Sequence, residues 1–406
     1  MENRNWKEIK LGDYLDSISK TFKFTDKEVV FLNTSDVLEG KVLNKEYESP
    51  IGLPGQAKKS IQKGDLLFSE IRPANKRYAR IDFDSEDYVV STKLMVLRVK
   101  GDLDPIFLEL YLTSEEILDY LQMIAEDRSG TFPQITFDII SKLELKLPPL
   151  PEQKAIASVL SSLDDKIDLL HQQNQTLEAL AETLFRQWFI EEAKEDWEEL
   201  PFSEWISETV GGDWGKETLQ GEFTKEVYCI RGTDIADLLT GIPTKTPIRF
   251  VKEKKFQSIE PKEGDIIIEI SGGTENQSTG RAYFINNEIK SLFGKDLVFS
   301  NFCRLIRIKD SNYSFFVYLY LKYLYDQDEF FNLENGSSGI KNLDYKSLLF
   351  ENKYKMPKED LVLKFNDLVS DSYKKINHNK FQIQTLTQLR DTLLPKLMSG
   401  EVRVKM

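Results

Sequence analysis

The chain has 406 residues, 40% of them hydrophobic and 30% charged, so it is long enough for two or more domains with cores of their own. Its formal net charge of −13 excludes a protein that coats nucleic acid nonspecifically, but not one that binds it locally. The two cysteines and two histidines are scattered, so a zinc site is not expected, and Cys229 and Cys303 are predicted to be reduced, buried thiols. No signal peptide or membrane-spanning segment is visible, which predicts a cytoplasmic protein without a membrane partner.

Residues 1–147 are predicted to form a mixed α/β domain. The runs "VVFLNT", "DLLFSEI" and "YVVSTKLMVLRV" are rich in β-branched and aromatic residues and predict strands, while "PIFLELYLTS" predicts a helix. From Lys58 to Arg80 the sequence has seven basic residues against two acids. This local excess makes the domain a candidate surface for binding an anionic partner.

Residues 148–195 are predicted to form one long helix. Prolines 148, 149 and 151 fix its start, and no Gly or Pro follows before Pro201. Apolar residues then alternate at spacings of four and three, which favours a coiled coil over an ordinary amphipathic core helix. Asn174 is a polar seam residue of the kind that fixes register. The predicted seam is Ile156, Leu160, Leu163, Ile167, Leu170, Asn174, Leu177, Ala181, Leu184 and Trp188.

Residues 196–357 are predicted to form a second α/β domain. Strands are predicted at "VYCI", "DIIIEI" and "FCRLIRI", followed by a helix at "SFFVYLYLKYLY". This last run is apolar, but it is short and interrupted by Lys322. We therefore expect a buried helix rather than a membrane span.

Residues 358–406 are predicted to form a second long helix whose seam repeats that of the first. Each seam residue lies 209 positions after its counterpart (365 − 156 = 209). The two helices are therefore expected to be partners in one coiled coil. The second seam is Phe365, Val369, Ser372, Ile376, Asn379, Ile383, Leu386, Arg390, Leu393 and Leu397.

The domains that precede the helices are also repeated. "NWKEIKLGDYL" returns as "DWEELPFSEWI" at an offset of 191, from Trp6 to Trp197. "KGDLLFSEI" returns as "EGDIIIEIS" at 200, and "STKLMVLRVK" returns as "SNFCRLIRIK" at 209. The offset grows along the chain because the second half contains inserted residues. The nine that separate offsets 200 and 209 (209 − 200) are expected around "SGGTENQSTG". The sequence thus predicts a duplicated α/β (α+β) chain, with loops that vary on a constant scaffold.

No catalytic constellation is found. "GGDWGKE" lacks the spacing and the hydroxyl of a phosphate-binding loop, and the E-x-K run Glu8–Lys10 lacks a partner acid for a nuclease. No N-P-P-Y or D-P-P-Y segment for amino-methyl transfer is present, and His171 and His378 are expected at solvated helix positions. We therefore predict a non-catalytic protein. An enzyme acting alone and a coiled-coil interaction adaptor without DNA specificity remain the alternatives.

Recognition is the remaining function, and two loops at equivalent strand ends are its candidates. "EIRPANKRYARI" offers cations, an Asn and a Tyr, while "EISGGTENQSTGRAYFI" offers glycines, amides and hydroxyls. Such groups can pair with base edges or phosphates. The loops "EDRSGTFPQITFD" and "ENGSSGIKNLDY", just before each helix, add further candidates. The candidate DNA-contacting residues are Lys58, Lys59, Arg72, Asn75, Lys76, Arg77, Tyr78, Arg80, Thr131 and Gln134 in the first half, and Ser271, Thr274, Asn276, Gln277, Ser278, Thr279, Arg281 and Lys341 in the second.

These motifs resemble one known family. "LPPLPEQKAIASVLSSLDDKI", "LFRQWF" and "LRDTLLPKLMSGEVRV" are similar to the helical regions of type I restriction-modification specificity subunits. The Gly-Asp pairs that begin at Gly64 and Gly264 and the Ser-Gly loops at 129–130 and 338–339 are similar to the same family. The resemblance covers the full length, although "MPKEDLVLKF" replaces the P-P-L-x-E-Q start in the second helix, where an irregular first turn is therefore expected.

The resemblance implies a non-catalytic subunit that recognises double-stranded DNA. Residues 1–147 and 196–357 would be target-recognition domains, each reading one half of a bipartite, asymmetric site. Residues 148–195 and 358–406 would form an antiparallel coiled-coil spacer in a pseudo-two-fold arrangement. Two methyltransferase subunits, which bind S-adenosylmethionine and methylate adenine, would dock on the helices. Restriction/translocase subunits that use ATP and Mg would join them, so no cofactor is expected in this chain.

Overall fold

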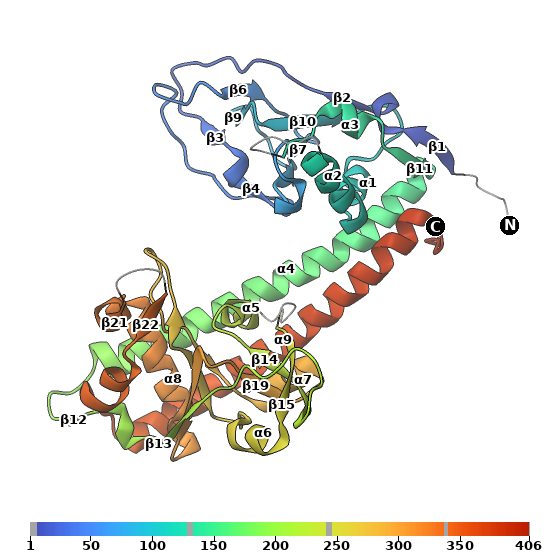
Figure 1. The fold of residues 1–406 in the computed structure, drawn as a ribbon. Helices are drawn as coiled ribbons and strands as arrows, with labels where there is room; N and C mark the ends of the chain where they lie inside the picture. The colour runs from blue at the N-terminus through green and yellow to red at the C-terminus, as the bar shows by residue number, and fades with distance from the viewer. Residues whose placement is uncertain (1–5, 128–132, 241–245, 337–339, 406) are drawn as a thin grey trace. The chain divides into compact units, whose positions relative to one another are not determined.

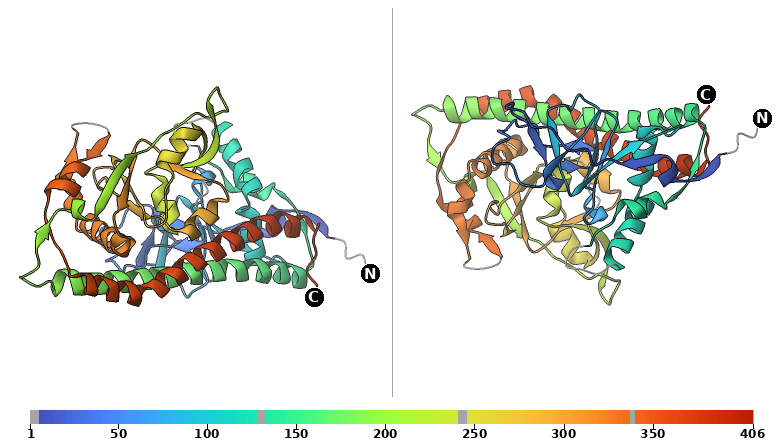
Figure 2. Two further views of the ribbon diagram at one scale, coloured as in Figure 1. Left: turned by 90° about the horizontal axis from the view of Figure 1, so that it is seen from below. Right: turned by 90° about the horizontal axis from the view of Figure 1, so that it is seen from above.

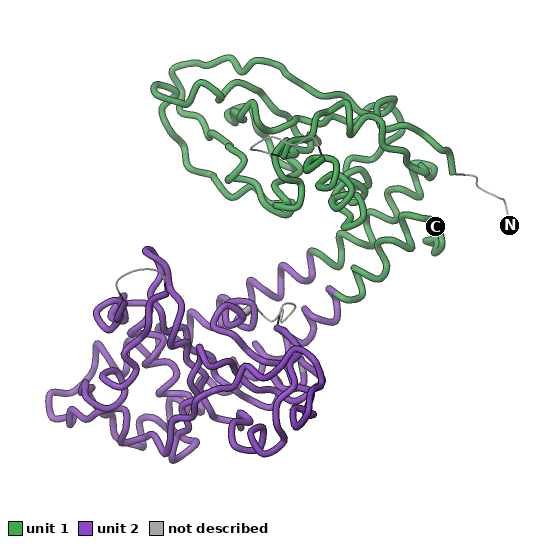
Figure 3. The backbone as a smooth tube through the Cα atoms, in the orientation of Figure 1, with its two compact units in different colours: residues 1–164, 388–406 green, residues 165–387 purple. Residues whose placement is uncertain are grey.

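The computed structural model describes residues 6–127, 133–240, 246–336 and 340–405, which form two compact units (Figures 1 and 3). The first unit contains residues 1–164 and 388–406, and the second contains residues 165–387. Both long helices are continuous, and each contributes one part to each unit. No helix of the described residues is long and apolar enough to cross a membrane.

The first unit contains antiparallel and mixed sheets. An antiparallel four-stranded sheet has the order β2-β10-β7-β8, and a three-stranded sheet has the order β3-β9-β6 with β3 parallel to β9. Strand β1 pairs with β11, and β4 pairs with β5. The strands are β1 (Lys7–Lys10), β2 (Leu15–Ser17), β3 (Val30–Leu32), β4 (Val37–Leu38), β5 (Lys41–Val42), β6 (Ala57–Ser60), β7 (Leu66–Ser69), β8 (Tyr78–Arg80), β9 (Tyr88–Ser91), β10 (Leu94–Val99) and β11 (Glu144–Leu147).

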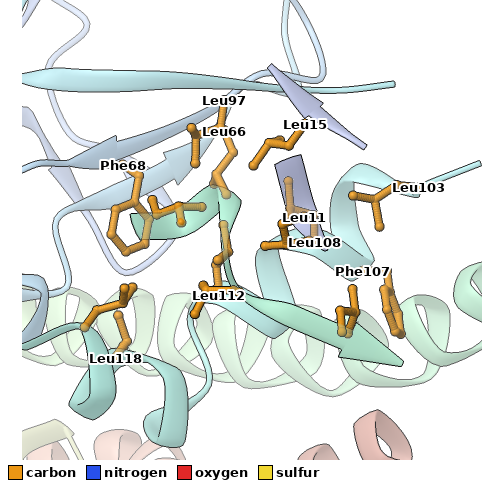
Figure 4. Close-up of a cluster of buried hydrophobic side chains, with 14 of the residues drawn as sticks. Leu11, Leu15, Leu66, Phe68, Leu97, Leu103, Phe107, Leu108, Leu112 and Leu118 are labelled. Carbon is orange, nitrogen blue, oxygen red and sulfur yellow. The ribbon is translucent and has the colours of Figure 1, made fainter. Parts of the chain in front are cut away.

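Three helices cover the four-stranded sheet of the first unit: α1 (Pro105–Leu112), α2 (Glu115–Asp127) and α3 (Phe137–Ser141). Helix α1 begins after Asp104 because that side chain accepts the N–H groups of Ile106 (3.0 Å) and Phe107 (3.1 Å). Phe68 and Leu97 from the sheet and Phe107 from α1 are buried in one cluster (Figure 4). Parts of both long helices pack against the same cluster, so the helices belong to the domain core.

The second unit repeats the four-stranded sheet and the parallel strand pair of the first. Its four-stranded sheet has the order β13-β20-β16-β18, and two three-stranded sheets have the orders β15-β14-β19 and β17-β22-β21. Strand β12 pairs with β23. The strands are β12 (Glu199–Leu200), β13 (Ile206–Gly211), β14 (Phe223–Ile230), β15 (Ile248–Lys252), β16 (Ile266–Glu269), β17 (Ser271–Gly272), β18 (Ala282–Phe284), β19 (Leu297–Phe299), β20 (Cys303–Ile308), β21 (Glu334–Asn335), β22 (Lys341–Leu343) and β23 (Tyr354–Lys355). The helices are α5 (Asp234–Thr240), α6 (Glu253–Ile259), α7 (Asn287–Phe293) and α8 (Ser311–Asp326).

Strand register confirms the duplication. In the first unit Leu97 pairs with Leu66, and in the second Ile306 pairs with Ile266, which preserves the offsets of 209 and 200 (306 − 97, 266 − 66). The parallel pairs β3·β9 and β14·β19 are likewise equivalent. A shared register at equivalent positions requires the same backbone pairing, so the two domains have one scaffold.

An ion pair on that scaffold is repeated as well. The Arg98 guanidinium binds the buried Asp65 carboxylate at 2.7 and 2.8 Å, and Arg307 binds Asp265 at 3.1 and 3.0 Å. Each carboxylate also accepts a backbone N–H three residues earlier, from Gln62 or its counterpart. These bonds tie the Gly-Asp turn at the start of β7 or β16 to the neighbouring strand.

Two expectations about the strands need correction. The run 88–99 was expected as one strand but forms β9 and β10, which belong to different sheets because the chain turns after the buried Ser91. The nine insertions do not all fall in the "SGGTENQSTG" loop. Leu67 pairs with Ala79, and its counterpart Ile267 pairs with Tyr283. The offset between the two units is therefore 200 in the first strand (267 − 67) and 204 in the second (283 − 79). Only four of the nine inserted residues lie between these strands. The other five lie between β18 and β19, where α7 has no counterpart.

The long helices are α4 (Leu150–Arg186), which ends in a π-helical turn (Gln187–Glu191), and α9 (Glu359–Ser399). They lie side by side (Figure 2) and are antiparallel, since Asp164 binds Arg390 in the first unit and Asn174 binds Asn379 in the second. Both helices start at equivalent positions (359 − 150 = 209). The altered sequence at the start of α9 therefore does not displace its first turn.

All residues of the predicted seam are buried or half-buried. At its centre lie two asparagines: Asn379 Nδ2 donates to Asn174 Oδ1 and to Gln173 Oε1, both at 2.8 Å. Ile156, Leu160, Ile167, Leu170, Asn174, Ala181, Phe365, Val369, Ile376, Asn379, Ile383 and Leu397 are buried, and Leu163, Leu177, Leu184, Trp188, Ser372, Leu386, Arg390 and Leu393 are half-buried.

Candidate nucleic-acid interface

The first candidate loop, residues 70–77, connects β7 to β8. Its middle is a short 3-10 helix, Pro73–Asn75, flanked by Arg72 and Lys76, which both have left-handed backbones with φ of 45° and 53°. Pro73 is buried, while Arg72, Asn75 and Lys76 are exposed. Non-glycine residues rarely adopt this conformation, so two of them in one loop indicate a shape held by its surroundings.

Several cations of this region serve the domain itself. Lys59 Nζ donates to the carbonyl oxygens of Thr92 (3.2 Å) and Leu94 (2.8 Å), and burial lowers the pKa of Lys59. Arg77 Nη1 donates to two carbonyl oxygens, of Ser35 (3.0 Å) and Val37 (3.3 Å). These two side chains fasten neighbouring segments and are not free to reach a ligand.

The next two predicted side chains are also occupied. Arg80 binds Glu109 of α1 at 2.9 Å, and burial is the largest effect on the raised pKa of that carboxyl group. Tyr78 stacks on Phe68 with 6.1 Å between ring centroids, and burial raises the pKa of Tyr78 to about 12. The exposed cations of the first loop are thus Arg72 and Lys76, of which Lys76 lies 3.0 Å from Glu39.

The remaining first-half candidates are placed as follows. Lys58 is exposed on β6, next to the inward-pointing Lys59. Gln134 is half-buried and forms a β-bridge with Ile71, which brings the loop before the long helix beside the first candidate loop. Thr131 and the Ser-Gly pair at 129–130 lie outside the described residues.

The second candidate loop, residues 270–281, connects β16 to β18 and is anchored by a buried acid. Glu269, 2% exposed, binds the guanidinium of Arg281 through two bonds of 3.0 Å. Burial acts to lower the pKa of Arg281, but Glu269 outweighs it, so that the pKa is raised. A Cβ on Gly272 would lie 2.4 Å from the Glu269 carboxylate, and one on Gly280 would lie 2.2 Å from the Phe330 ring. The glycines therefore allow this close packing.

A second acid orders the far side of this loop. Glu334 accepts the backbone N–H of Thr279 (2.6 Å) and binds Lys341 (2.8 Å). Burial acts to raise the pKa of Glu334, but these partners outweigh it, so that the pKa is lowered. Lys341 also lies 5.1 Å from the centroid of the Phe331 ring. Ser278 and Thr279 are buried, so their part in the loop is structural.

Three predicted residues remain exposed in the second loop: Thr274, Asn276 and Gln277. Gln277 Nε2 donates to the Tyr325 hydroxyl at 3.2 Å, and Ser271, which is half-buried, donates to Asn342 at 2.8 Å. The Ser-Gly pair at 338–339 lies outside the described residues. This loop therefore presents amides and a hydroxyl where the first loop presents cations and an amide.

Sequence reasoning missed the acids that hold both loops. Glu269 carried one signal, since it is the acid in the otherwise apolar run "IIIEI". Glu109 and Glu334 carried none, because Glu109 lies 29 residues from Arg80 and Glu334 lies 55 residues from Thr279 of the loop that it orders. Among the described residues no group of three or more His, Cys, Asp or Glu could hold a metal ion, and His378 is exposed while His171 is half-buried.

Comparisons with known proteins decide the family. Residues 3–179 match the family model of the type I restriction modification DNA specificity domain. The HindI specificity subunit of a type I restriction enzyme from Haemophilus influenzae is 33% identical to this chain, over 98% of this chain and 100% of the relative. This chain belongs to the type I restriction enzyme specificity subunits. The MjaIX specificity subunit from Methanocaldococcus jannaschii is 27% identical, over 74% of this chain and 69% of the relative.

A solved structure agrees with this family in fold. The S subunit of a type I restriction-modification system from M. genitalium matches with a TM-score of 0.58 at 17% identity, over 100% of this chain and 98% of that chain. The protein is thus a specificity subunit, the non-catalytic component that recognises DNA sequence in such an enzyme. The alternative of a coiled-coil adaptor without DNA specificity has no support.

Proposed function

We propose that each unit of this specificity subunit reads one half of a bipartite, asymmetric DNA site through its hairpin loop. One observation carries the proposal: the loops 70–77 and 270–281 join equivalent strands of one scaffold but expose different chemistry. A scaffold kept constant by register and by the repeated Asp–Arg pair, with loops that differ, supports two different targets. The domain boundaries expected from the sequence, 1–147 and 196–357, are retained in this proposal.

The exposed side chains define the chemistry of each half-site. Arg72 and Lys76 would donate to guanine edges or to phosphates, and Asn75 would pair with an adenine edge. In the second unit, Asn276 and Gln277 are amides of the kind that bind adenine through two hydrogen bonds. Lys58, Gln134 and Ser271 would contribute at the margins. The occupied side chains, among them Arg77, Arg80 and Arg281, would position the loops.

The long helices would space the two domains and dock two methyltransferase subunits. Large apolar side chains on their outer surfaces support docking: Leu169 and Leu180 of α4 are 56% and 51% exposed, and Leu368 and Phe381 of α9 are 53% and 51% exposed. Where such side chains form a contiguous patch, they mark an interaction site. The methyltransferase partners would bind S-adenosylmethionine and methylate adenine, and restriction/translocase partners would use ATP and Mg. The chain itself would act in the cytoplasm without a cofactor.

Two matched sets of variants test the proposal in the assembled methyltransferase. Alanine at Arg72, Asn75 and Lys76 should relax or abolish recognition of the first half-site and leave the second intact. Alanine at Thr274, Asn276 and Gln277 should do the reverse, so each set is the control of the other. A base-reading contact should cost roughly 1–3 kcal/mol at one position, whereas a phosphate contact should weaken all sequences and reduce the salt dependence. If both sets leave the modified sequence and the salt dependence unchanged, these loops are not the DNA-binding face.

A further inference from the structure

A second exposed turn lies beside each hairpin loop, between β9 and β10 in the first unit and between β19 and β20 in the second. Both turns are built in the same way. Ser91 Oγ accepts the N–H of Lys93 at 3.2 Å, and Ser300 Oγ accepts the N–H of Phe302 at 3.3 Å. Both serines are fully buried. Positions 93 and 302 are therefore equivalent (302 − 93 = 209), as are the strands on either side.

Each turn is hydrogen-bonded to the start of its hairpin loop. The carbonyl oxygen of Lys93 accepts the N–H of Glu70 at 3.2 Å, and that of Phe302 accepts the N–H of Ile270 at 2.9 Å. Across that hydrogen bond, Lys93 is joined to a residue two positions before the exposed Arg72, and Phe302 is joined to a residue four positions before the exposed Thr274. A ligand that covers the loop is within reach of these side chains.

Other residues hold the turns in place. In the first unit the Lys59 ammonium group fastens the turn through the carbonyl oxygens of Thr92 and Leu94. In the second unit Gly212 packs against the turn so closely that a Cβ there would lie 2.2 Å from the oxygen of Ser300. The backbone is thus fixed on both sides while the tip remains exposed, an arrangement that preorganises a contact residue.

The side chains at the tips differ in class. Lys93 is exposed, and Phe302 is 47% exposed although it lies between buried strands. A single exposed apolar residue is ordinary on a protein surface. Phe302 is distinguished by its place, since its backbone position is equivalent to that of an exposed lysine on a turn fixed by the same bonds. A constant backbone that carries a cation in one domain and a ring in the other repeats the pattern of the two hairpin loops.

We propose that Lys93 and Phe302 are specificity-determining contacts, one in each half-site. This inference rests on the proposed function and adds a second reading element to each domain. Lys93 would donate to guanine O6 or N7, beside the contacts of Arg72. Phe302 would make an apolar contact with a thymine methyl group, beside those of Asn276 and Gln277. The ligand is duplex DNA in both cases.

Substitution in the assembled methyltransferase tests this proposal, with a plasmid library randomised in both half-sites as substrate. Phe302→Ala should lower discrimination about tenfold at one position of the second half-site, since a contact of this kind contributes on that order, and leave the first half-site unchanged. Phe302→Leu keeps an apolar side chain and should retain part of the preference for thymine. Lys93→Ala should change only the first half-site. Uracil in place of thymine at the affected position should reproduce the effect of Phe302→Ala.

Matched controls separate reading from general damage. Phe350 is 45% exposed in the same unit as Phe302, and Phe350→Ala should leave both half-sites unchanged. Lys63 is the control for Lys93: it is exposed just before the start of β7, whereas the hairpin loop follows the end of that strand. If Phe302→Ala and Lys93→Ala leave every position of both half-sites unchanged, the inference is overturned while the proposed function stands. If the unsubstituted enzyme modifies no two-part sequence, the proposed function fails, and this inference with it.

Discussion

The buried asparagine pair of the helix seam makes a quantitative prediction. Asn379 is fully buried and Asn174 is 6% exposed, and the Asn379 amide nitrogen donates to Asn174 Oδ1 and to Gln173 Oε1. A buried polar group that loses its partner costs about 1–3 kcal/mol, whereas removal of both partners leaves no unpaired group. Alanine at either position should therefore destabilise the second unit more than the hydrogen bond alone would suggest.

The two single substitutions should differ in size. Asn379→Ala removes both hydrogen bonds and should lower the free energy of unfolding by about 2–3 kcal/mol. This value combines the cost of leaving the Asn174 side-chain oxygen without a donor and the cost of a small cavity. Asn174→Ala leaves Gln173 as an acceptor for Asn379 and should cost about 1 kcal/mol less. The double variant should be more stable than the sum of the two effects predicts, by about 1 kcal/mol or more. Gln173→Ala, at an exposed position, is the matched control and should have little effect.

Hydrogen exchange measured by mass spectrometry is the assay. Peptides that cover residues 170–178 and 376–386 report the opening free energy of this segment whether or not the first unit unfolds with it. An expected change of about 1.4 kcal/mol corresponds to a tenfold faster exchange. Effects that add to within about 0.5 kcal/mol in the double variant would refute the paired amides. The side-chain oxygen Oδ1 of Asn379 is buried without a hydrogen-bond partner among the described residues. Replacement of both asparagines by leucine removes this unpaired atom and should be neutral or stabilising.

Three further predictions concern the repeated scaffold, the thiols and the spacer. Asp65→Asn should destabilise the first unit by roughly 2 kcal/mol in urea unfolding, and Asp265→Asn should do the same in the second. The cost is smaller than for a fully buried pair because Arg98 reaches solvent. Variants as stable as the parent would contradict a structural ion pair. Burial raises the pKa of the Cys229 and Cys303 thiols to about 12, so the nucleophilic thiolate is scarce at pH 8. Iodoacetamide should therefore label these thiols only when urea unfolds the second unit. Labelling of the folded chain would disprove this. Seven residues can be inserted in each long helix, between Gln172 and Gln173 and between Lys380 and Phe381. One heptad adds about 10 Å, so the spacer of the modified site should lengthen by about three base pairs. An unchanged spacer would show that the helices do not set its length.

Periodicity and repetition made much of the fold predictable. The four-three spacing placed Asn174 and Asn379 on the seam, where they face each other, and constant offsets predicted the shared register. These features depend on position along the chain, which a sequence states directly. The split of residues 88–99 into two strands was not predictable from the run itself, because the turn depends on the buried Ser91 hydroxyl rather than on Gly or Pro.

The candidate interface was less predictable because charge was counted along the sequence. Arg77, Arg80 and Arg281 look like ligand-binding cations until their partners are seen, and those partners lie up to 42 residues away. The start of α4 shows the same effect. Glu152 of the P-P-L-x-E-Q motif is buried against Arg403, and Gln153 Nε2 donates to the carbonyl oxygens of Asp102 and Pro148, both at 2.8 Å. Such partners become visible only once the chain is folded.

Mapping of the modified adenines is the measurement that tests the central claim most directly. The chain would be expressed with its methyltransferase partner in a host without methylated adenine, and the genome sequenced by a method that detects the modified base. The account predicts one asymmetric sequence in two parts separated by a fixed unspecified spacer, with the first part altered by Arg72→Ala and the second by Gln277→Ala. Modification at a single uninterrupted sequence, or changes in the same half from both substitutions, would contradict it.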